Sequence, residues 1–150
     1  MDDYKIDHRI SDDYLKSLKK LLGQLLDEVD DQTGLSLENF QEKIMEMLED
    51  DNHHLLIAVK QGEVVGFINF TVRKTILHQQ PSALIDELVV DKNYRGKGLG
   101  KKLVYQAINR AKQLKCGEIE VSTEKSNEQA RKYYQKIGFE EDAVLLEKNL

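Results

Sequence analysis

The segment 85–103, I-D-E-L-V-V-D-K-N-Y-R-G-K-G-L-G-K-K-L, constrains the fold of this chain more than any other. An apolar, β-branched run ends at Val90, and Gly96, Gly98 and Gly100 then open a segment with helical spacing. A strand, a glycine-rich turn and a helix start let backbone N–H groups converge on an anion, and the helix N-terminus adds partial positive charge. The sequence therefore predicts a phosphate cradle, with a flexible loop before a helix as the plainer alternative.

Two widespread phosphate motifs do not fit this turn. A P-loop requires G-x-x-x-x-G-K-[ST], and Lys101-Lys102-Leu103 supplies no hydroxyl for a metal. The dinucleotide fingerprint G-x-G-x-x-G fails because the third glycine comes one residue early. Basic side chains nevertheless crowd the turn and favour a multiply charged anion: Lys92, Arg95, Lys97, Lys101 and Lys102.

Composition narrows the class of protein. The chain has 150 residues, so we expect a single domain over residues 1–150. A net charge of −5 argues against nucleic acid as a partner. The single cysteine, Cys116, allows no internal disulfide, and we find neither a signal peptide nor an apolar run long enough for a membrane. We therefore expect a cytoplasmic protein, without membrane contact and without a metal site, since no Cys/His cluster has metal spacing.

The spacing of apolar residues predicts alternating strands and helices, and hence an α/β fold with a mixed sheet. Strands are expected at residues 4–9, 54–60, 63–75, 83–90, 118–123 and 143–148. Helices are expected at residues 12–29, after Ser36 as N-cap, at 99–115, and from Ser126 or Asn127 to Lys136. Gly117 and Gly138 are expected to end the last two helices.

A second motif completes a resemblance to the GNAT superfamily of N-acetyltransferases. Arg95, Gly98 and Gly100 fill that family's [RQ]-x-x-G-x-[GA] signature. Its motif N-x-x-A-x-x-[FY]-Y followed by G-[FY] is matched by Asn127, Ala130, Tyr133, Tyr134, Gly138 and Phe139. The likeness covers residues 5–150. It implies the GNAT-type acyl-CoA N-acyltransferase fold, α/β (α+β) with a mixed central sheet flanked by helices.

The resemblance also implies an activity and a co-substrate. The family transfers an acetyl group from acetyl-CoA directly to a primary amine of a small molecule or a protein. The pyrophosphate would lie on the turn, and the pantetheine arm would pair with the end of the strand before it, as in strand augmentation. Asn127 would hold the arm from the other side. The implied cofactor-binding residues are Leu88, Val89, Val90, Arg95, Gly96, Lys97, Gly98, Leu99, Gly100, Lys101, Asn127 and Tyr134.

Catalysis needs a polarised thioester, a proton for the departing thiolate and a neutral amine. The family implies a backbone N–H near Leu88 or Val89 as donor to the thioester oxygen. Tyr134 is the candidate acid, with a place in the core as its plainer role, and Tyr133 is read as packing. Asp86 and Glu87 are candidate bases. Relatives often carry a base on the face shared by residues 84, 86 and 88, which favours Asp86, although ion pairing or ordered water remain alternatives.

The acceptor is not identified by the sequence. In the family, the first helices and the segment before the fourth strand usually shape its pocket, here residues 12–50 and 74–82. Acidic side chains at residues 27–31 and 49–51 would attract a cationic amine if they border the cleft, or simply form a solvated face. Relatives are often dimers, so a homodimer is a further expectation. A catalytically silent acetyl-CoA sensor domain and a plain interaction module are the alternative functions.

Overall fold

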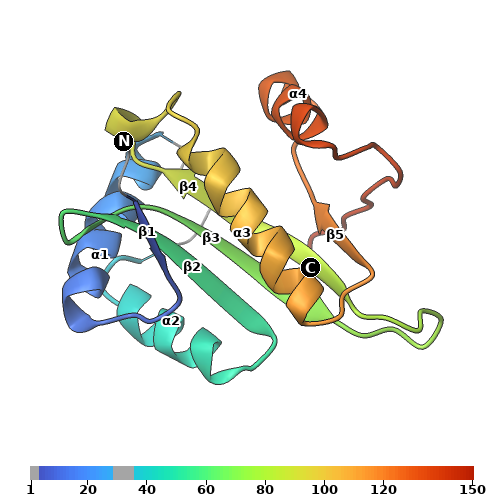
Figure 1. Ribbon diagram of the computed structural model, residues 1–150, viewed down its shortest axis with the longest axis horizontal. Coiled ribbons are helices and arrows are strands. Elements are labelled where there is room, and N and C mark those ends of the chain that lie inside the picture. Colours follow the sequence, from blue (N-terminus) through green and yellow to red (C-terminus); the bar gives the residue numbers. More distant parts are fainter. Residues whose placement is uncertain (1–3, 29–35) are drawn as a thin grey trace.

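The computed structural model describes residues 4–28 and 36–150, and its elements follow the expected order (Figure 1). The first half contains β1 (Lys5–Asp7), α1 (Asp12–Glu28), α2 (Phe40–Glu49), β2 (His53–Lys60) and β3 (Glu63–Arg73). The second half contains β4 (Ser82–Val90), the 3-10 turn η1 (Lys92–Tyr94), α3 (Leu99–Gln113), β5 (Glu118–Val121) and α4 (Glu128–Ile137). Residues 29–35, which include most of the acidic segment after the first helix, lie outside the described chain.

The five strands form one mixed sheet in the order β1-β2-β3-β4-β5. The first four strands pair antiparallel, and β5 pairs parallel to β4. A tight turn at Gln61 (φ 52°) and Gly62 (φ 81°) joins β2 to β3, and two consecutive positive φ angles are typical of hairpin turns. Helices α1 and α2 lie on one face of the sheet, and α3 crosses the other (Figure 1). The expected α/β fold with a mixed sheet is confirmed.

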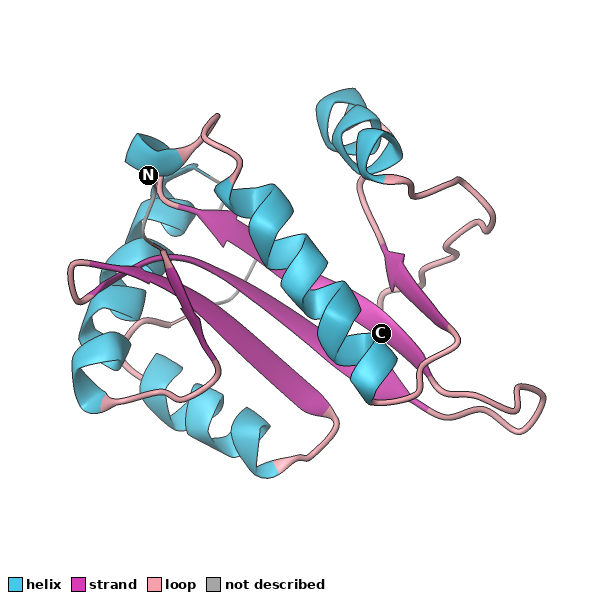
Figure 2. Cartoon of the chain, viewed as in Figure 1, coloured by secondary structure: helices cyan, strands magenta, loops and turns pink. Residues whose placement is uncertain are grey.

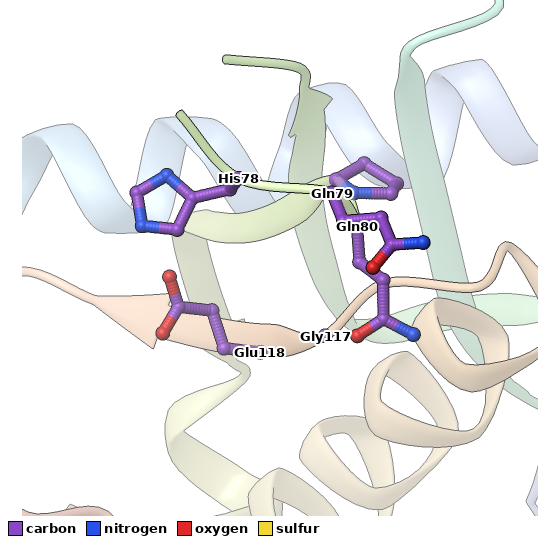
Figure 3. A pocket seen from close by; sticks show the side chains of 6 residues that line it. His78, Gln79, Gln80, Gly117 and Glu118 are labelled. Atoms are coloured by element: carbon purple, nitrogen blue, oxygen red, sulfur yellow. The ribbon is translucent and has the colours of Figure 1, made fainter. Parts of the chain in front are cut away.

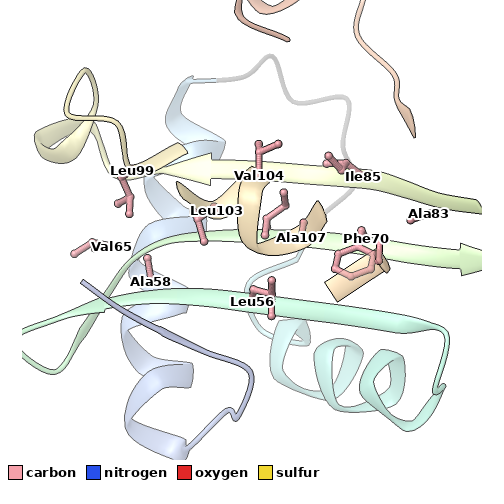
Figure 4. Packing of buried hydrophobic residues seen from close by; sticks show 12 residues of the cluster. Leu56, Ala58, Val65, Phe70, Ala83, Ile85, Leu99, Leu103, Val104 and Ala107 are labelled. Atoms are coloured by element: carbon pink, nitrogen blue, oxygen red, sulfur yellow. The ribbon is translucent and has the colours of Figure 1, made fainter. Parts of the chain in front are cut away.

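Each face of the sheet carries its own hydrophobic cluster. On the α3 side, Phe70, Leu99, Leu103 and Val104 are fully buried (Figure 4). The partly buried Tyr134 of α4 packs against the same cluster. On the α1 and α2 side, the buried residues are Leu15, Leu18, Leu21, Phe40, Leu55, Ile57, Val59, Val64, Phe67 and Val89. Helix α3 therefore fixes the strand and the glycine turn from one side, while α1 supports the same strands from the other.

Two helix ends differ from the prediction. The second helix begins at Phe40 with Asn39 as N-cap, so Ser36 is not its cap. Leu37, which the apolar spacing assigned to this helix, lies in the turn before it. Helix α3 ends at Gln113 with Leu114 as C-cap, and the residue with a left-handed backbone that follows is Lys115 (φ 64°), not Gly117. Gly117 serves a close approach instead, because a Cβ there would lie 2.7 Å from Gln80 Oε1.

The predicted last strand, residues 143–148, is wrong for this structure. Residues 139–150 form no strand, and the segment after α4 is loop throughout (Figure 2). Val144, Leu145 and Leu146 are 85%, 64% and 89% exposed. The apolar pattern describes only a local preference, whereas a strand also needs a partner edge, and this segment has none within the described chain.

Two classes of feature are absent from residues 4–28 and 36–150. None of their helices combines the length and the apolar character that crossing a membrane would require. No three His, Cys, Asp or Glu side chains among them gather as metal ligands.

Candidate functional site

The glycine turn presents the start of α3 without a capping side chain. Gly96 and Gly98 have φ angles of 73° and 81°, in the left-handed region that glycine adopts without strain. Gly98 is the N-cap of α3, and a glycine supplies no side-chain acceptor for the first N–H groups of the helix. No side chain caps those groups, and the N-terminus of a helix is a place where an anionic ligand can bind.

The third glycine of the turn serves a different purpose. A Cβ on Gly100 would lie 2.8 Å from the Tyr133 hydroxyl oxygen and 3.7 Å from Val90 Cγ2. Glycine at position 100 thus allows α4 to approach α3 closely. The Tyr133 hydroxyl is buried there without a hydrogen-bond partner. Tyr133 does pack, as expected, but its polar end meets the glycine turn, which sequence reasoning did not foresee.

Side chains brace the turn from both sides. Arg95 Nε donates to the carbonyl of Val90 at 2.9 Å, and Lys97 Nζ donates to the carbonyl of Asn93 at 3.1 Å. From α1, the amide oxygen of Gln24 accepts the N–H of Lys92 at 2.8 Å. Leu99 contributes only its backbone to the turn, because its side chain is fully buried in the core. Lys101 and Lys102 are exposed on the first turn of α3.

The edge of β4 next to this turn is open. The parallel ladder between β4 and β5 runs from Ser82–Glu118 to Ile85–Val121, where β5 ends. Strand β4 continues to Val90, so residues 86–90 have no strand partner on the β5 side within the described chain. In Figure 1 the two strands diverge at this point, with α4 beyond them. The structure thereby brings the open edge at residues 88–90 next to the glycine turn, and an extended ligand can pair with such an edge.

A β-bulge lies at the two candidate bases. Glu87 pairs with Asn69 while Ile85 pairs with Phe70, so Asp86 is the extra residue in β4. Ala83 and Ile85 before the bulge, and Leu88 and Val90 after it, all join the cluster under α3. The alternation of faces therefore shifts at Asp86, and residues 84, 86 and 88 do not share one face. The premise that favoured Asp86 over Glu87 is wrong.

Glu87 has a defined partner. Its carboxylate oxygen Oε2 accepts a hydrogen bond from Asn69 Nδ2 at 2.8 Å, and Asn69 is only 5% exposed. Since Val89, two residues after Glu87, packs against the α1 and α2 cluster, Glu87 faces that same side of the sheet. Asp86 and Glu87 are both exposed. Asn69 was missed from the sequence, although a lone polar residue in the apolar run F-I-N-F was its signal.

Tyr134 is half-buried on α4 among aromatic rings. Its ring meets those of Tyr133 and Phe139 edge to face, at centroid distances of 5.3 and 5.5 Å. Burial, together with the neighbouring Tyr133 hydroxyl, raises the pKa of Tyr134 to about 12. The phenol therefore keeps its proton at neutral pH with a wide margin, as a group that donates a proton must.

Asn127, the first residue of the second motif, has a structural role. It is the N-cap of α4, and its Oδ1 accepts the N–H of Ala130 at 3.1 Å. Gly138 ends the same helix with φ 105°, as predicted. The asparagine and the glycine thus set where the tyrosine-bearing helix begins and ends.

A separate pocket lies at the opposite end of β4. It is lined by His78, Gln79, Gln80, Pro81, Gly117 and Glu118, where the β3–β4 connection meets the start of β5 (Figure 3). Two further histidines have partners elsewhere: His53 Nδ1 lies 3.2 Å from an Asp50 carboxylate oxygen, and His54 stacks on Phe70. None of these groups is near the glycine turn in the fold.

Fold and site together define an α/β protein with an uncapped glycine turn beside an open strand edge. Comparison with known proteins assigns this arrangement to a family. The family model of the Acetyltransferase (GNAT) family matches residues 16–139. The chain belongs to the GNAT family of acetyltransferases.

Individual relatives agree with the assignment. The chain is 30% identical over 107 residues to the aminoalkylphosphonate N-acetyltransferase of Salmonella typhimurium, covering 71% of this chain and 70% of that protein. Its fold is similar to glucosamine-6-phosphate N-acetyltransferase from Arabidopsis thaliana, with a TM-score of 0.79, 23% identity and 97% of each chain covered. It is also similar to AAC(6')-Iy in complex with a bisubstrate analogue of CoA, with a TM-score of 0.80, 21% identity and 98% of each chain covered.

Proposed function

We propose that this protein is an N-acetyltransferase that moves an acetyl group from acetyl-CoA directly to a primary amine. The observation that carries the proposal is the open edge of β4 at residues 86–90, which runs straight into an uncapped glycine turn. An extended, amide-containing arm that ends in a diphosphate matches both features at once. Membership in the acetyltransferase family supports the same co-substrate.

The residues present fit acetyl-CoA. A Cβ at Gly96 or Gly98 would meet nothing within 4 Å, so the space beside the backbone is open at both positions. The N-terminus of α3 and the exposed Lys101 and Lys102 supply positive potential for a diphosphate. Backbone N–H and C=O groups of Leu88, Val89 and Val90 would hold the pantetheine amides.

The chain's own groups would then promote the transfer. When bound, acetyl-CoA supplies an activated acyl group on a thiol leaving group. A backbone N–H at Leu88 or Val89 would polarise the thioester oxygen. Tyr134, kept neutral by its raised pKa, would give its proton to the departing sulfur. The amine loses one proton as the new amide bond forms, so one proton leaves the nitrogen for each proton that the sulfur receives.

Glu87 is the better placed of the two candidate bases. Asn69 orients its carboxylate, and it lies on the side of the sheet that α1 and α2 cover. Asp86 sits at the bulge without a hydrogen-bond partner of this kind to orient it. Either could accept the amine's proton directly or through water. The acidic side chains at residues 49–51 are exposed at the end of α2.

An amine panel followed by CoA thiol release tests the proposal. Tyr134→Phe should lower kcat on the best amine by about 100-fold or more, because it removes the proton donor, while CoA affinity changes little. Tyr105→Phe is the matched control, since Tyr105 is 44% exposed on the outer side of α3, and it should retain full activity. Equal rates for Tyr134→Phe and wild type would remove Tyr134 from the acid role.

A binding measurement separates enzyme from sensor. Acetyl-CoA at about 100 times its Kd should stabilise the fold by about 2.7 kcal/mol, seen as a higher Tm. Stabilisation without turnover of any amine would favour the silent sensor domain. No stabilisation at all would leave only an interaction module with this fold.

Glu87→Gln and Asp86→Asn distinguish the bases. We expect the first to lower kcat by about 100-fold at neutral pH and the second to leave it within a few-fold. If Asp86→Asn lowered kcat more than Glu87→Gln, Asp86 would be the base. Full activity in both variants would point to ordered water as the proton acceptor.

A further inference from the structure

The side chain of Gln24 reaches from α1 to the point where β4 ends and the glycine turn begins. Its Oε1 accepts the N–H of Lys92 at 2.8 Å, and its Nε2 donates to Asp91 Oδ2 over a longer 3.4 Å. The backbone N–H of Lys92 can only donate, so it fixes the amide oxygen on its own side and leaves the NH₂ group for the carboxylate. One side-chain amide thus holds two neighbouring residues that follow it by 67 and 68 positions in the chain.

Asp91 is the residue through which this contact acts on the turn. It is the N-cap of η1, and its Oδ1 accepts the N–H of Asn93 at 2.8 Å. Its own N–H donates to the Val65 carbonyl at 3.0 Å, and its carbonyl accepts the N–H of Tyr94 at 2.8 Å. With Gln24 at Oδ2, each polar atom of Asp91 has a partner, so the chain leaves β4 in one defined direction.

The direction set at Asp91 continues into the glycines. Arg95 Nε donates to the Val90 carbonyl and Lys97 Nζ to the Asn93 carbonyl, so the turn is braced against the end of β4 and against η1. Gln24 differs from these two braces because it belongs to α1, whose apolar side chains pack on the face of the sheet opposite α3 (Figure 1). Its amide therefore joins the turn to the helices of the other face.

We propose that Gln24 is a positioning residue for the co-substrate: it holds residues 91 and 92 so that the uncapped N–H groups at the start of α3 stay aimed at the diphosphate of acetyl-CoA. An anion site built from backbone N–H groups depends on their direction, since each must point at the same oxygen atoms. Gln24 acts only through the backbone that it holds. The inference rests on the proposed function, because that function supplies the diphosphate.

The plainer role for Gln24 is to fasten α1 to the sheet, and α1 provides a matched control for that role. Ser17 lies about two turns earlier on the same helix, and its Oγ accepts the N–H of Val64 at 2.9 Å. That hydrogen bond also joins α1 to the sheet, but it ends on β3 beside the β2–β3 hairpin and not on the glycine turn. Ser17→Ala and Gln24→Ala should therefore both lower Tm, whereas only Gln24→Ala should change the binding of acetyl-CoA.

Calorimetric titration and steady-state kinetics measure the difference. Gln24→Ala should raise the Kd and the KM of acetyl-CoA by about 10-fold, as expected when hydrogen bonds that hold a site are lost. Its kcat should stay within a few-fold of wild type, because Tyr134 and Glu87 are untouched. Ser17→Ala should bind acetyl-CoA as tightly as wild type. Equal affinity in Gln24→Ala and wild type, or an equal loss of affinity in Ser17→Ala, would overturn the proposal.

An exchange of charge tests the specific contact. Gln24→Glu places a second carboxylate against Asp91, and Asp91→Asn places a second NH₂ group against that of Gln24, so each single variant should weaken acetyl-CoA binding. In the double variant the introduced carboxylate can accept from both the Lys92 N–H and the introduced NH₂ group, so affinity should return to within a few-fold of wild type. A pure charge effect gives tighter binding for Asp91→Asn and additive single effects, and that result would contradict the positioning role.

Hydrogen exchange follows the turn without any ligand. In Gln24→Ala the backbone amides of Lys92 and of residues 93–98 should exchange faster than in wild type, whereas Ser17→Ala should leave them unchanged. Unchanged exchange in Gln24→Ala would show that this side chain does not hold the turn. If wild type itself gives no heat with acetyl-CoA, the proposed function fails, and the exchange rates alone decide whether Gln24 positions the turn.

Discussion

The Gly100–Tyr133 contact shows how one hydrogen atom in place of a methyl group shapes the site. Gly100→Ala would force its Cβ to within 2.8 Å of the Tyr133 hydroxyl oxygen, and overpacking of this kind costs about 1–3 kcal/mol. Without that oxygen the nearest ring atom lies 3.7 Å away, an ordinary contact. We therefore expect Tyr133→Phe to rescue Gly100→Ala.

Urea unfolding of the two single variants and the double variant measures this coupling. Tyr133→Phe alone should be neutral or slightly stabilising, because it removes a buried hydroxyl that has no partner. If the double variant is no more stable than Gly100→Ala, the hydroxyl is not the obstacle.

Tyr134 gives a prediction about alkaline pH. Its pKa is raised to about 12 in the folded state, whereas an unfolded tyrosine titrates near about 10. Between these values the unfolded chain loses the proton first, so the free energy of unfolding should fall as pH rises from about 10 to 12. At neutral pH the group contributes no such dependence.

Difference absorbance of tyrosinate, wild type minus Tyr134→Phe, checks this assignment. The difference should appear only near pH 12, and the Tyr134→Phe variant should lose stability less steeply above pH 10. A tyrosine that titrates near 10 in the difference curve would place Tyr134 in water rather than among the aromatic rings.

At the scale of elements, two helices end with the same hydrogen-bond pattern but different residues. In α3, Cys116 N–H donates to Ala111 and Lys115 has φ 64°; in α4, Phe139 N–H donates to Tyr134 and Gly138 has φ 105°. A non-glycine residue in the left-handed region costs about 1–2 kcal/mol. Lys115→Gly should therefore stabilise the protein by about 1 kcal/mol, measured by thermal or urea unfolding.

Gly138→Ala is the mirror experiment. Nothing lies within 4 Å of a Cβ at this position, so only the backbone conformation opposes the substitution. We expect a loss of about 1 kcal/mol. If wild type, Lys115→Gly and Gly138→Ala were equally stable, the left-handed residues at 115 and 138 would not be what ends the two helices.

Elements with strong periodicity or a clear turn could be predicted from the sequence. The β2–β3 hairpin, the strand into the glycine turn and the helix after it all lie within a few residues of their expected bounds. The bulge at Asp86 could not be predicted from the sequence. It becomes visible only when β4 is paired with β3, because Asp86 then has no partner residue in β3. The tail 143–148 failed for the same reason: local preference describes a strand, but its partner is a matter of tertiary structure.

At the scale of the molecule, two hydrophobic clusters share one sheet. Phe70, fully buried, lies in the cluster under α3, and Leu18, 1% exposed, lies in the cluster under α1 and α2. Because the same strands carry both clusters, loss of either should destabilise the whole sheet. Phe70→Ala and Leu18→Ala should each cost about 2–5 kcal/mol.

Calorimetry checks that cooperativity. Each variant should show one transition at a lower temperature, and Met45→Ala, at an exposed site, should change little. Two separate transitions in either variant would mean that the two sides of the sheet unfold independently.

The extra residue at position 86 has a consequence for chain length. It takes up one position of β4 without a partner of its own in β3, and beyond it Leu88 and Val90 point toward α3 and Val89 toward α1. Deleting Asp86 would leave Ile85 opposite Phe70 and Glu87 opposite Asn69 as consecutive pairs, so the side chains that follow would keep their sides of the sheet. Deleting Leu88 instead would move Val89 and Val90 to the opposite sides. We therefore expect β4 to lose a residue at the bulge more readily than one between the bulge and the glycines.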